Sequence, residues 1–259
     1  MINLVKYELL GKYKSYGMVL ILALLLNIAL LFTVGSWPDG AIFALSILIM
    51  VGVFVAVLVL SIGVFSQDIY EDRGYLTFTL PQSGYSILAS KLLVTLIFYF
   101  LSMTIAAAFL GHFFFSINDI KVGLDAVGIK INMPLILAAI IVTEAMSFVM
   151  LLTMIYFSIA VTKLAIAKKR SGKFAAFVVF VLISIVYKII IFYLAKFIPQ
   201  NVYIPLVQAV SGNISANIDP TGELTRGIPV NIASTVFAFI TFIGMFIGTA
   251  LIVEKKIDL

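Results

Sequence analysis

Residues 67–91, QDIYEDRGYLTFTLPQSGYSILASK, form a short polar stretch between two long apolar runs, residues 41–65 and 92–115. The stretch places four charged residues within six positions and then adds glycine and proline. A segment of this kind does not lie in hydrocarbon unless protein or water surrounds it. It therefore predicts a connection outside the membrane between two spanning helices.

The composition of the whole chain gives the same class of protein. Of its 259 residues, 63% are hydrophobic and 11% are charged, and the mean hydropathy is +1.20. A soluble domain is about a quarter charged. We therefore expect an all-α polytopic membrane protein with one transmembrane domain, residues 1–259. The chain has no cysteine, which excludes disulfides and thiolate sites. We attribute its net charge of +5 to the orientation of the chain in the membrane and not to binding of nucleic acid.

Six apolar runs are long enough to cross a bilayer, which takes about 20 helical residues. The predicted spans are residues 16–34, 41–65, 92–115, 134–162, 174–194 and 232–253. Residues 1–15 alternate apolar and charged side chains, which predicts a helix lying in the membrane interface. The alternative is an ordinary extension of the first span.

The lysines and arginines decide the orientation. With six spans, both termini lie on one side, and the segments of that side carry 12 of the 17 basic residues. The opposite segments carry four, and Lys188 lies within a span. The positive-inside rule therefore predicts cytoplasmic termini and a cytoplasmic residue 67–91 connection, in a multi-pass protein of the cell membrane.

Two segments resemble the permease subunits of ABC-2 type exporters, which have the type V exporter fold. They are KYELLGKYKSYG, residues 6–17, and EDRGYLTFTLPQSGYSILASKLL, residues 71–93, with the pattern Asp-x-Gly-x-Leu-x-x-x-x-Pro. The long connection before the last span and the basic C-terminal end are similar as well. The resemblance implies a dimer, with a second copy or a homologous permease, bound to cytoplasmic nucleotide-binding ATPase subunits. ATP and magnesium then belong to those subunits, and this chain holds no cofactor of its own and binds no nucleic acid.

The resemblance also implies a cytoplasmic coupling helix within residues 67–91 and an extracellular re-entrant cap over residues 198–230. Apolar side chains along one side of the coupling helix need a partner surface, although they can also dip into the membrane interface. The expected contacts with the ATPase subunit are Glu71, Asp72, Arg73, Tyr75, Leu76, Phe78 and Leu80. The cap segment is long and nearly uncharged, so we expect it to be ordered, partly helical and broken at its prolines.

Two charges lie inside predicted spans. Glu144 and Lys188 belong to consecutive antiparallel spans at heights that differ by only about 5 Å. An isolated charge in the bilayer is costly, so we expect the two residues to pair within one subunit. A proton or substrate relay is the functional alternative.

No catalytic constellation, metal-ligand spacing or phosphate-binding loop occurs, so we expect a transport subunit without its own ATPase site. Aromatic residues of the second and fifth spans can line a pathway for hydrophobic or amphipathic cargo (a peptide, drug or lipid), and an aromatic core explains them equally well. These candidates are Phe43, Phe54, Phe65, Phe180 and Tyr187. Gly244 and Gly248 have a spacing that permits close helix packing. The alternative function is a secondary transporter driven by an ion gradient through Glu144.

Overall fold

The structure is a computed structural model that describes residues 2–70, 83–117, 129–131, 133–165, 172–205, 207–209 and 227–255. Six helices in this part of the chain are long and apolar enough to cross a membrane. They are α1 (Ile2–Leu31), α2 (Asp39–Tyr70), α4 (Gly84–Ile117), α6 (Met133–Ala165), α7 (Gly172–Phe197) and α8 (Ile232–Lys255). The prediction of a helical polytopic membrane protein with six spans is confirmed.

Most of these helices extend beyond the predicted spans. The longest, α4, has 34 residues and is about 50 Å long, whereas the hydrocarbon core is about 30 Å thick. The ends of α4 therefore project from the hydrocarbon unless the helix is tilted. As a result, both ends of the polar 67–91 stretch belong to helices, since α2 runs to Tyr70 and α4 starts at Gly84.

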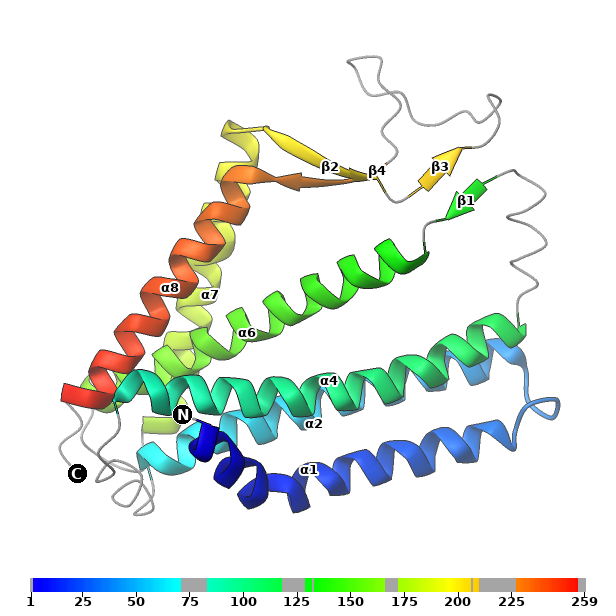
Figure 1. The fold of residues 1–259 in the computed structure, drawn as a ribbon, viewed down its shortest axis with the longest axis horizontal. Coiled ribbons are helices and arrows are strands. Elements are labelled where there is room, and N and C mark those ends of the chain that lie inside the picture. The colour runs from blue at the N-terminus through cyan, green and yellow to red at the C-terminus, as the bar shows by residue number, and fades with distance from the viewer. Residues whose placement is uncertain are drawn as a thin grey trace.

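The N-terminal helix is continuous, and the interfacial position of residues 1–15 stays a prediction. α1 runs without a break across the predicted boundary between an interfacial helix, residues 1–15, and the first span. It bends in its first third but remains one element (Figure 1). No proline or paired glycines interrupt residues 2–31, and its first part packs against protein, so continuing the helix satisfies every backbone group.

A tight turn joins α1 to α2. Gly35 has φ of +84°, a left-handed conformation that glycine adopts without strain. The carbonyl of Pro38 accepts a hydrogen bond from the Ala41 amide at 2.9 Å, which starts α2 directly after the proline. This turn connects the two helices as antiparallel neighbours (Figure 1).

The helices converge at one end of the molecule and spread apart toward the other (Figure 1). α1, α2 and α4 run side by side, α7 and α8 run together in another direction, and α6 lies between the two groups. α4 contacts α8, and α2 contacts α6, which joins the groups where they converge. The beginning of α1 and the end of α8 lie at this same end, as an even number of spans requires.

The far end carries two short antiparallel ribbons. β2 (Asn201–Pro205) pairs with β4 (Gly227–Asn231), and β1 (Ile129–Ile131) pairs with β3 (Val207–Ala209). The expectation of short helices in the 198–230 cap is wrong for the residues described there. Alternating β-branched and aromatic residues favour strands, and Pro205 and Pro229 disfavour helices. Residues 206 and 210–226 lie outside the described residues.

Candidate functional site

Three charged side chains meet where the helices converge. The Lys91 ammonium donates hydrogen bonds to Glu8 Oε1 at 2.6 Å and to Asp68 Oδ2. The Lys91 side chain is 1% exposed, while the carboxylates are 19% and 16% exposed. We call Glu8, Asp68 and Lys91 the charge cluster. Its two ion pairs are the salt bridges of the described part of the chain.

Each member of the charge cluster comes from a different helix. Glu8 lies in the first part of α1, Asp68 lies near the end of α2, and Lys91 lies near the start of α4. Asp68 and Lys91 thus stand on the two sides of the connection 71–82, which itself lies outside the described residues. The cluster ties both ends of that connection to each other and to α1.

Further polar contacts extend the cluster into the bundle. Lys12 Nζ, one turn after Glu8, donates a hydrogen bond to Gln67 Oε1 at 2.7 Å. One turn deeper, the Tyr16 hydroxyl lies 3.2 Å from Ser61 Oγ, and the Tyr156 hydroxyl donates to the Ser61 carbonyl at 2.9 Å. These contacts join α1, α2 and α6, and hydrogen bonds with little access to water hold such helices in one arrangement.

Sequence reasoning treated residues 67–91 as one polar connection and did not find the charge cluster. Asp68 and Lys91 belong to that stretch, but both lie on helices, and Lys91 is buried. Residues 85–90 carry no helix-breaking residue, which is a signal that α4 begins well before Leu92. The partner Glu8 could not be chosen from sequence, since only the packing of α1 brings it to Lys91.

The predicted contacts with an ATPase subunit all lie outside the described residues. They are Glu71, Asp72, Arg73, Tyr75, Leu76, Phe78 and Leu80. They therefore stay a prediction. The structure describes the helix ends on both sides of them and the charge cluster that connects those ends.

The expected pair between Glu144 and Lys188 is not formed in the described structure. Glu144 Oε2 instead accepts a hydrogen bond from the Tyr99 hydroxyl at 3.3 Å. Both Glu144 and Lys188 are exposed. The estimate of their heights assumed two parallel axes, but α6 and α7 separate from each other along their length (Figure 1).

The five aromatic pathway candidates lie in different environments. Phe65 is 1% exposed and stacks on Tyr156 with ring centroids 4.3 Å apart, so it belongs to the core of a single subunit. Phe54 packs edge-on against Tyr99 and Phe148 next to that core. Tyr187 stacks on Phe237 of α8, and Phe43 is half-buried. Phe180 alone of the five lines the cavity described below.

The two glycines of α8 differ in their surroundings. A Cβ atom at Gly248 would lie 3.0 Å from the ring of Phe157 on α6, whereas one at Gly244 would meet no atom within 4 Å. A closer approach occurs at Gly84, the first residue of α4. A Cβ there would collide with the Ala250 carbonyl of α8, and the Gly84 amide donates to Glu254 Oε2 at 3.3 Å. The sequence pattern gives no sign that Gly84 is a packing residue, because its neighbour Ala250 lies more than 160 positions away.

The described geometry of the charge cluster is that of a lysine ammonium shared by two carboxylates. The described residues contain no group of three or more His, Cys, Asp or Glu side chains that could hold a metal ion. The two carboxylates already share one ammonium group, and no nucleophile contacts them among the hydrogen bonds given above. The cluster is therefore suited to fixing the relative positions of three helices.

No protein-family model, curated protein or solved structure matches the chain.

Proposed function

We propose that the chain is the membrane-spanning subunit of an ATP-driven exporter of the ABC-2 type. It works as a dimer with a second copy or a homologous permease, in the cell membrane with both termini in the cytoplasm. ATP is hydrolysed by a separate nucleotide-binding subunit, and the cargo is hydrophobic or amphipathic. The sequence resemblance in residues 6–17 and 71–93 leads to this proposal, and one structural observation supports it.

That observation is the charge cluster at the base of the 71–82 connection. A segment that is moved by an ATPase must transmit this movement to the spanning helices. A flexible connection between the segment and those helices would dissipate the movement. Asp68 and Lys91 lock the two helices that carry the connection to each other, and Glu8 adds α1 to the same unit. A push on residues 71–82 would then move α1, α2 and α4 as one body.

Binding to the ATPase should depend on the apolar side chains in the connection. Buried apolar residues at the centre of an interface carry most of its binding energy, while charges at the rim set register and association rate. We expect Leu76→Asp and Phe78→Asp to release the proposed nucleotide-binding ATPase subunit. Thr77→Asp is the matched control, because it adds the same charge between the two apolar positions.

The experiment is a pull-down of the ATPase with the purified permease, combined with cargo-stimulated ATP hydrolysis in proteoliposomes. Charge reversal at Glu71 and Asp72 should give a smaller effect that depends on salt concentration. All variants should insert and dimerise as the wild type does. Unchanged binding and unchanged coupling in both Leu76→Asp and Phe78→Asp would refute the assignment.

A secondary transporter remains the second candidate because of Glu144. This carboxylate lies in a membrane-spanning helix, and its partner is a tyrosine hydroxyl rather than a cation of the described residues. Such a carboxylate can take up and release protons during a transport cycle. Transport that persists without ATP, collapses with a protonophore and is lost in Glu144→Gln would favour this function over the exporter.

A further inference from the structure

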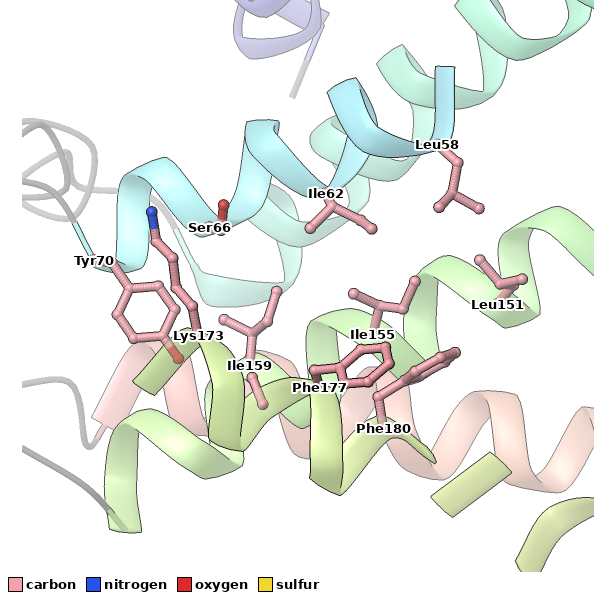
Figure 2. Close-up of a pocket in the computed structure, with 11 residues that line it drawn as sticks. Leu58, Ile62, Ser66, Tyr70, Leu151, Ile155, Ile159, Lys173, Phe177 and Phe180 are labelled. Atoms are coloured by element: carbon pink, nitrogen blue, oxygen red, sulfur yellow. The ribbon is translucent and has the colours of Figure 1, made fainter. Parts of the chain in front are cut away.

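A cavity of about 350 Å³ lies between α2, α6 and α7 near the end where the helices converge (Figure 2). Its volume is in the range of sites for small molecules, which starts near 300 Å³. Apolar side chains make up most of its wall. The residues that line it are Leu58, Ile62, Ser66, Tyr70, Leu151, Ile155, Ile159, Lys173, Ala176, Phe177 and Phe180.

The cavity wall changes from apolar to polar along its length on α2 and α7. On α2, the lining residues at intervals of four run from Leu58 to Ser66 and Tyr70. On α7, the wall runs from Phe180 to Lys173, and on α6 the stripe of lining residues continues one turn further to Lys163. The α2 and α7 stripes therefore begin apolar and end polar or cationic at the same end of the molecule, where Lys163 follows the apolar lining residues of α6.

The polar end of the cavity holds a buried group without a partner. Tyr70 is 4% exposed, and its hydroxyl has no hydrogen-bond partner among the described residues. Burying an unpaired hydroxyl costs about 1–3 kcal/mol, so such groups usually bind a ligand or water. Since no described residue accepts its hydrogen, the Tyr70 hydroxyl can donate a hydrogen bond to an occupant of the cavity.

Two lysines lie near the Tyr70 side chain, one in the cavity wall and one over the ring. Lys173 lines the cavity, and Lys163 Nζ lies 5.8 Å from the centre of the Tyr70 ring. Neither forms an ion pair with a carboxylate of the described residues, where the nearby Asp68 is bound to Lys91. Among the described residues, the end of the cavity thus has Lys173 in its wall, Lys163 next to it, and a hydroxyl that can donate a hydrogen bond.

The length of the site fits one leaflet of a bilayer. Leu58 and Tyr70 are twelve helical positions apart, which is about 18 Å along α2. Half of the hydrocarbon core is about 15 Å thick. A lipid whose acyl chain ended beside Leu58 and Phe180 would place its head group at the polar end of the cavity, at the membrane surface.

From this arrangement we propose that the cavity between α2, α6 and α7 binds an anionic phospholipid of the cytoplasmic leaflet. One acyl chain lies against the apolar stripes. The phosphate lies between Lys163 and Lys173 and accepts a hydrogen bond from the Tyr70 hydroxyl. Basic pockets between spanning helices on the cytoplasmic side are suited to anionic head groups, because the phosphate charge is compensated where water is scarce. The site does not depend on whether an ATPase binds the chain.

Fluorescence quenching by brominated lipid tests the proposal in the full-length protein. Trp37→Phe removes the single tryptophan, and Phe180→Trp places a reporter in the cavity wall. In bilayers of phosphatidylcholine, brominated phosphatidylglycerol should quench this reporter at low mole fractions. Brominated phosphatidylcholine with the same chains should require much higher mole fractions. Equal quenching by the two lipids would overturn the proposal.

Charge variants test the head-group end of the cavity. Lys163→Gln and Lys173→Gln should each weaken the preference for phosphatidylglycerol about fivefold, and the double variant should nearly remove it. Lys196→Gln is the matched control, since Lys196 is an exposed lysine at the other end of α7. A preference unchanged in the double variant would refute the site. Glycerol 3-phosphate without acyl chains should not compete, and competition by it would assign the site to a free phosphate ligand instead.

Tyr70→Phe gives a readout that does not depend on the reporter. Without anionic lipid, the variant should melt at the same or a higher temperature than the wild type, because an unpaired buried hydroxyl has been removed. With phosphatidylglycerol present, the wild type should gain more thermal stability than the variant. Equal stabilisation of both proteins would mean that the hydroxyl does not contact the lipid, against the proposal.

Discussion

The Lys91 ammonium lies between the carboxylates of Glu8 and Asp68, so the three groups together carry one negative charge. Removing either carboxylate leaves one complete ion pair. Removing the ammonium leaves two carboxylates facing each other with no compensating charge. Breaking a buried ion pair by deleting one partner costs about 3–5 kcal/mol.

We therefore expect unequal effects of three substitutions on the free energy of unfolding. Lys91→Met should destabilise the protein by about 3–5 kcal/mol. Glu8→Gln and Asp68→Asn should each cost about 1–2 kcal/mol, since a charge-assisted hydrogen bond is lost while one ion pair remains. Unfolding of the purified protein in bicelles gives all three values. Lys188→Met is the control, because Lys188 is exposed, and equal losses for Lys91→Met and Lys188→Met would contradict a stabilising cluster.

The contact between Tyr99 and Glu144 gives a second prediction at this scale. Tyr99→Phe and Glu144→Gln should be coupled in a double-mutant cycle by at least about 0.5 kcal/mol, because the two side chains share a hydrogen bond. Glu144→Gln and Lys188→Met should instead be additive within about 0.5 kcal/mol. Coupling between Glu144→Gln and Lys188→Met, with additive effects of Tyr99→Phe and Glu144→Gln, would instead support an ion pair between Glu144 and Lys188.

The sequence revealed which residues are charged inside the membrane but not which of them meet. The rise per residue gives the height of a side chain on its helix, and this placed Glu144 and Lys188 at similar depths. The lateral distance depends on the crossing of α6 and α7, which two isolated sequence segments do not encode. For the same reason, Glu8 could not be assigned to Lys91 before the packing of α1 was known.

At the scale of the elements, the start of α4 lies against the backbone of α8 at Gly84. A methyl group at this position would collide with the Ala250 carbonyl, and backbone atoms cannot move aside as a flexible side chain can. We expect Gly84→Ala to separate the start of α4 from the end of α8 and to lower the melting temperature. Gly244→Ala should leave it unchanged or raise it, because open space surrounds Gly244 and alanine favours a helix by about 1 kcal/mol.

Thermal unfolding in detergent distinguishes the two glycine variants. Equal melting temperatures for Gly84→Ala and Gly244→Ala would show that the contact between α4 and α8 does not hold the helices together. Gly248→Ala should fall between them, since its methyl group would lie 3.0 Å from the edge of the movable Phe157 ring. The order of the three variants thus tests the packing of α8 on both of its neighbours.

At the level of elements, the sequence predicted the six apolar helices well because length and hydropathy decide them. It predicted their ends less well, since a polar residue such as Asp68 can remain helical when another helix supplies its partner. The ribbon of β2 and β4 was missed for a related reason. Residues 201–205 and 227–231 are 22 or more positions apart, and neither strand is stable before it pairs with the other.

The arrangement of the whole molecule makes a prediction about topology. The ends of α6 and α7 that flank Ser171 lie at the convergent end with the start of α1, whereas β2 and β4 lie at the far end (Figure 1). The segments assigned to the convergent end carry 12 lysines and arginines, and the opposite segments carry four. Basic segments are retained on the cytoplasmic side during insertion, so the convergent end should face the cytoplasm.

Single cysteines test this orientation directly, because the chain contains no native cysteine. In intact cells, a membrane-impermeant maleimide should label Thr221→Cys but not Ser171→Cys, and Ser171→Cys should react once the membrane is permeabilised. Val57→Cys, at a position that is 0% exposed, should stay unlabelled in both conditions. If Ser171→Cys were labelled in intact cells and Thr221→Cys were not, the predicted orientation of the protein in the membrane would be reversed. The lysines of the proposed lipid site and the 71–82 connection would then face the outside, where no ATP-hydrolysing partner is available.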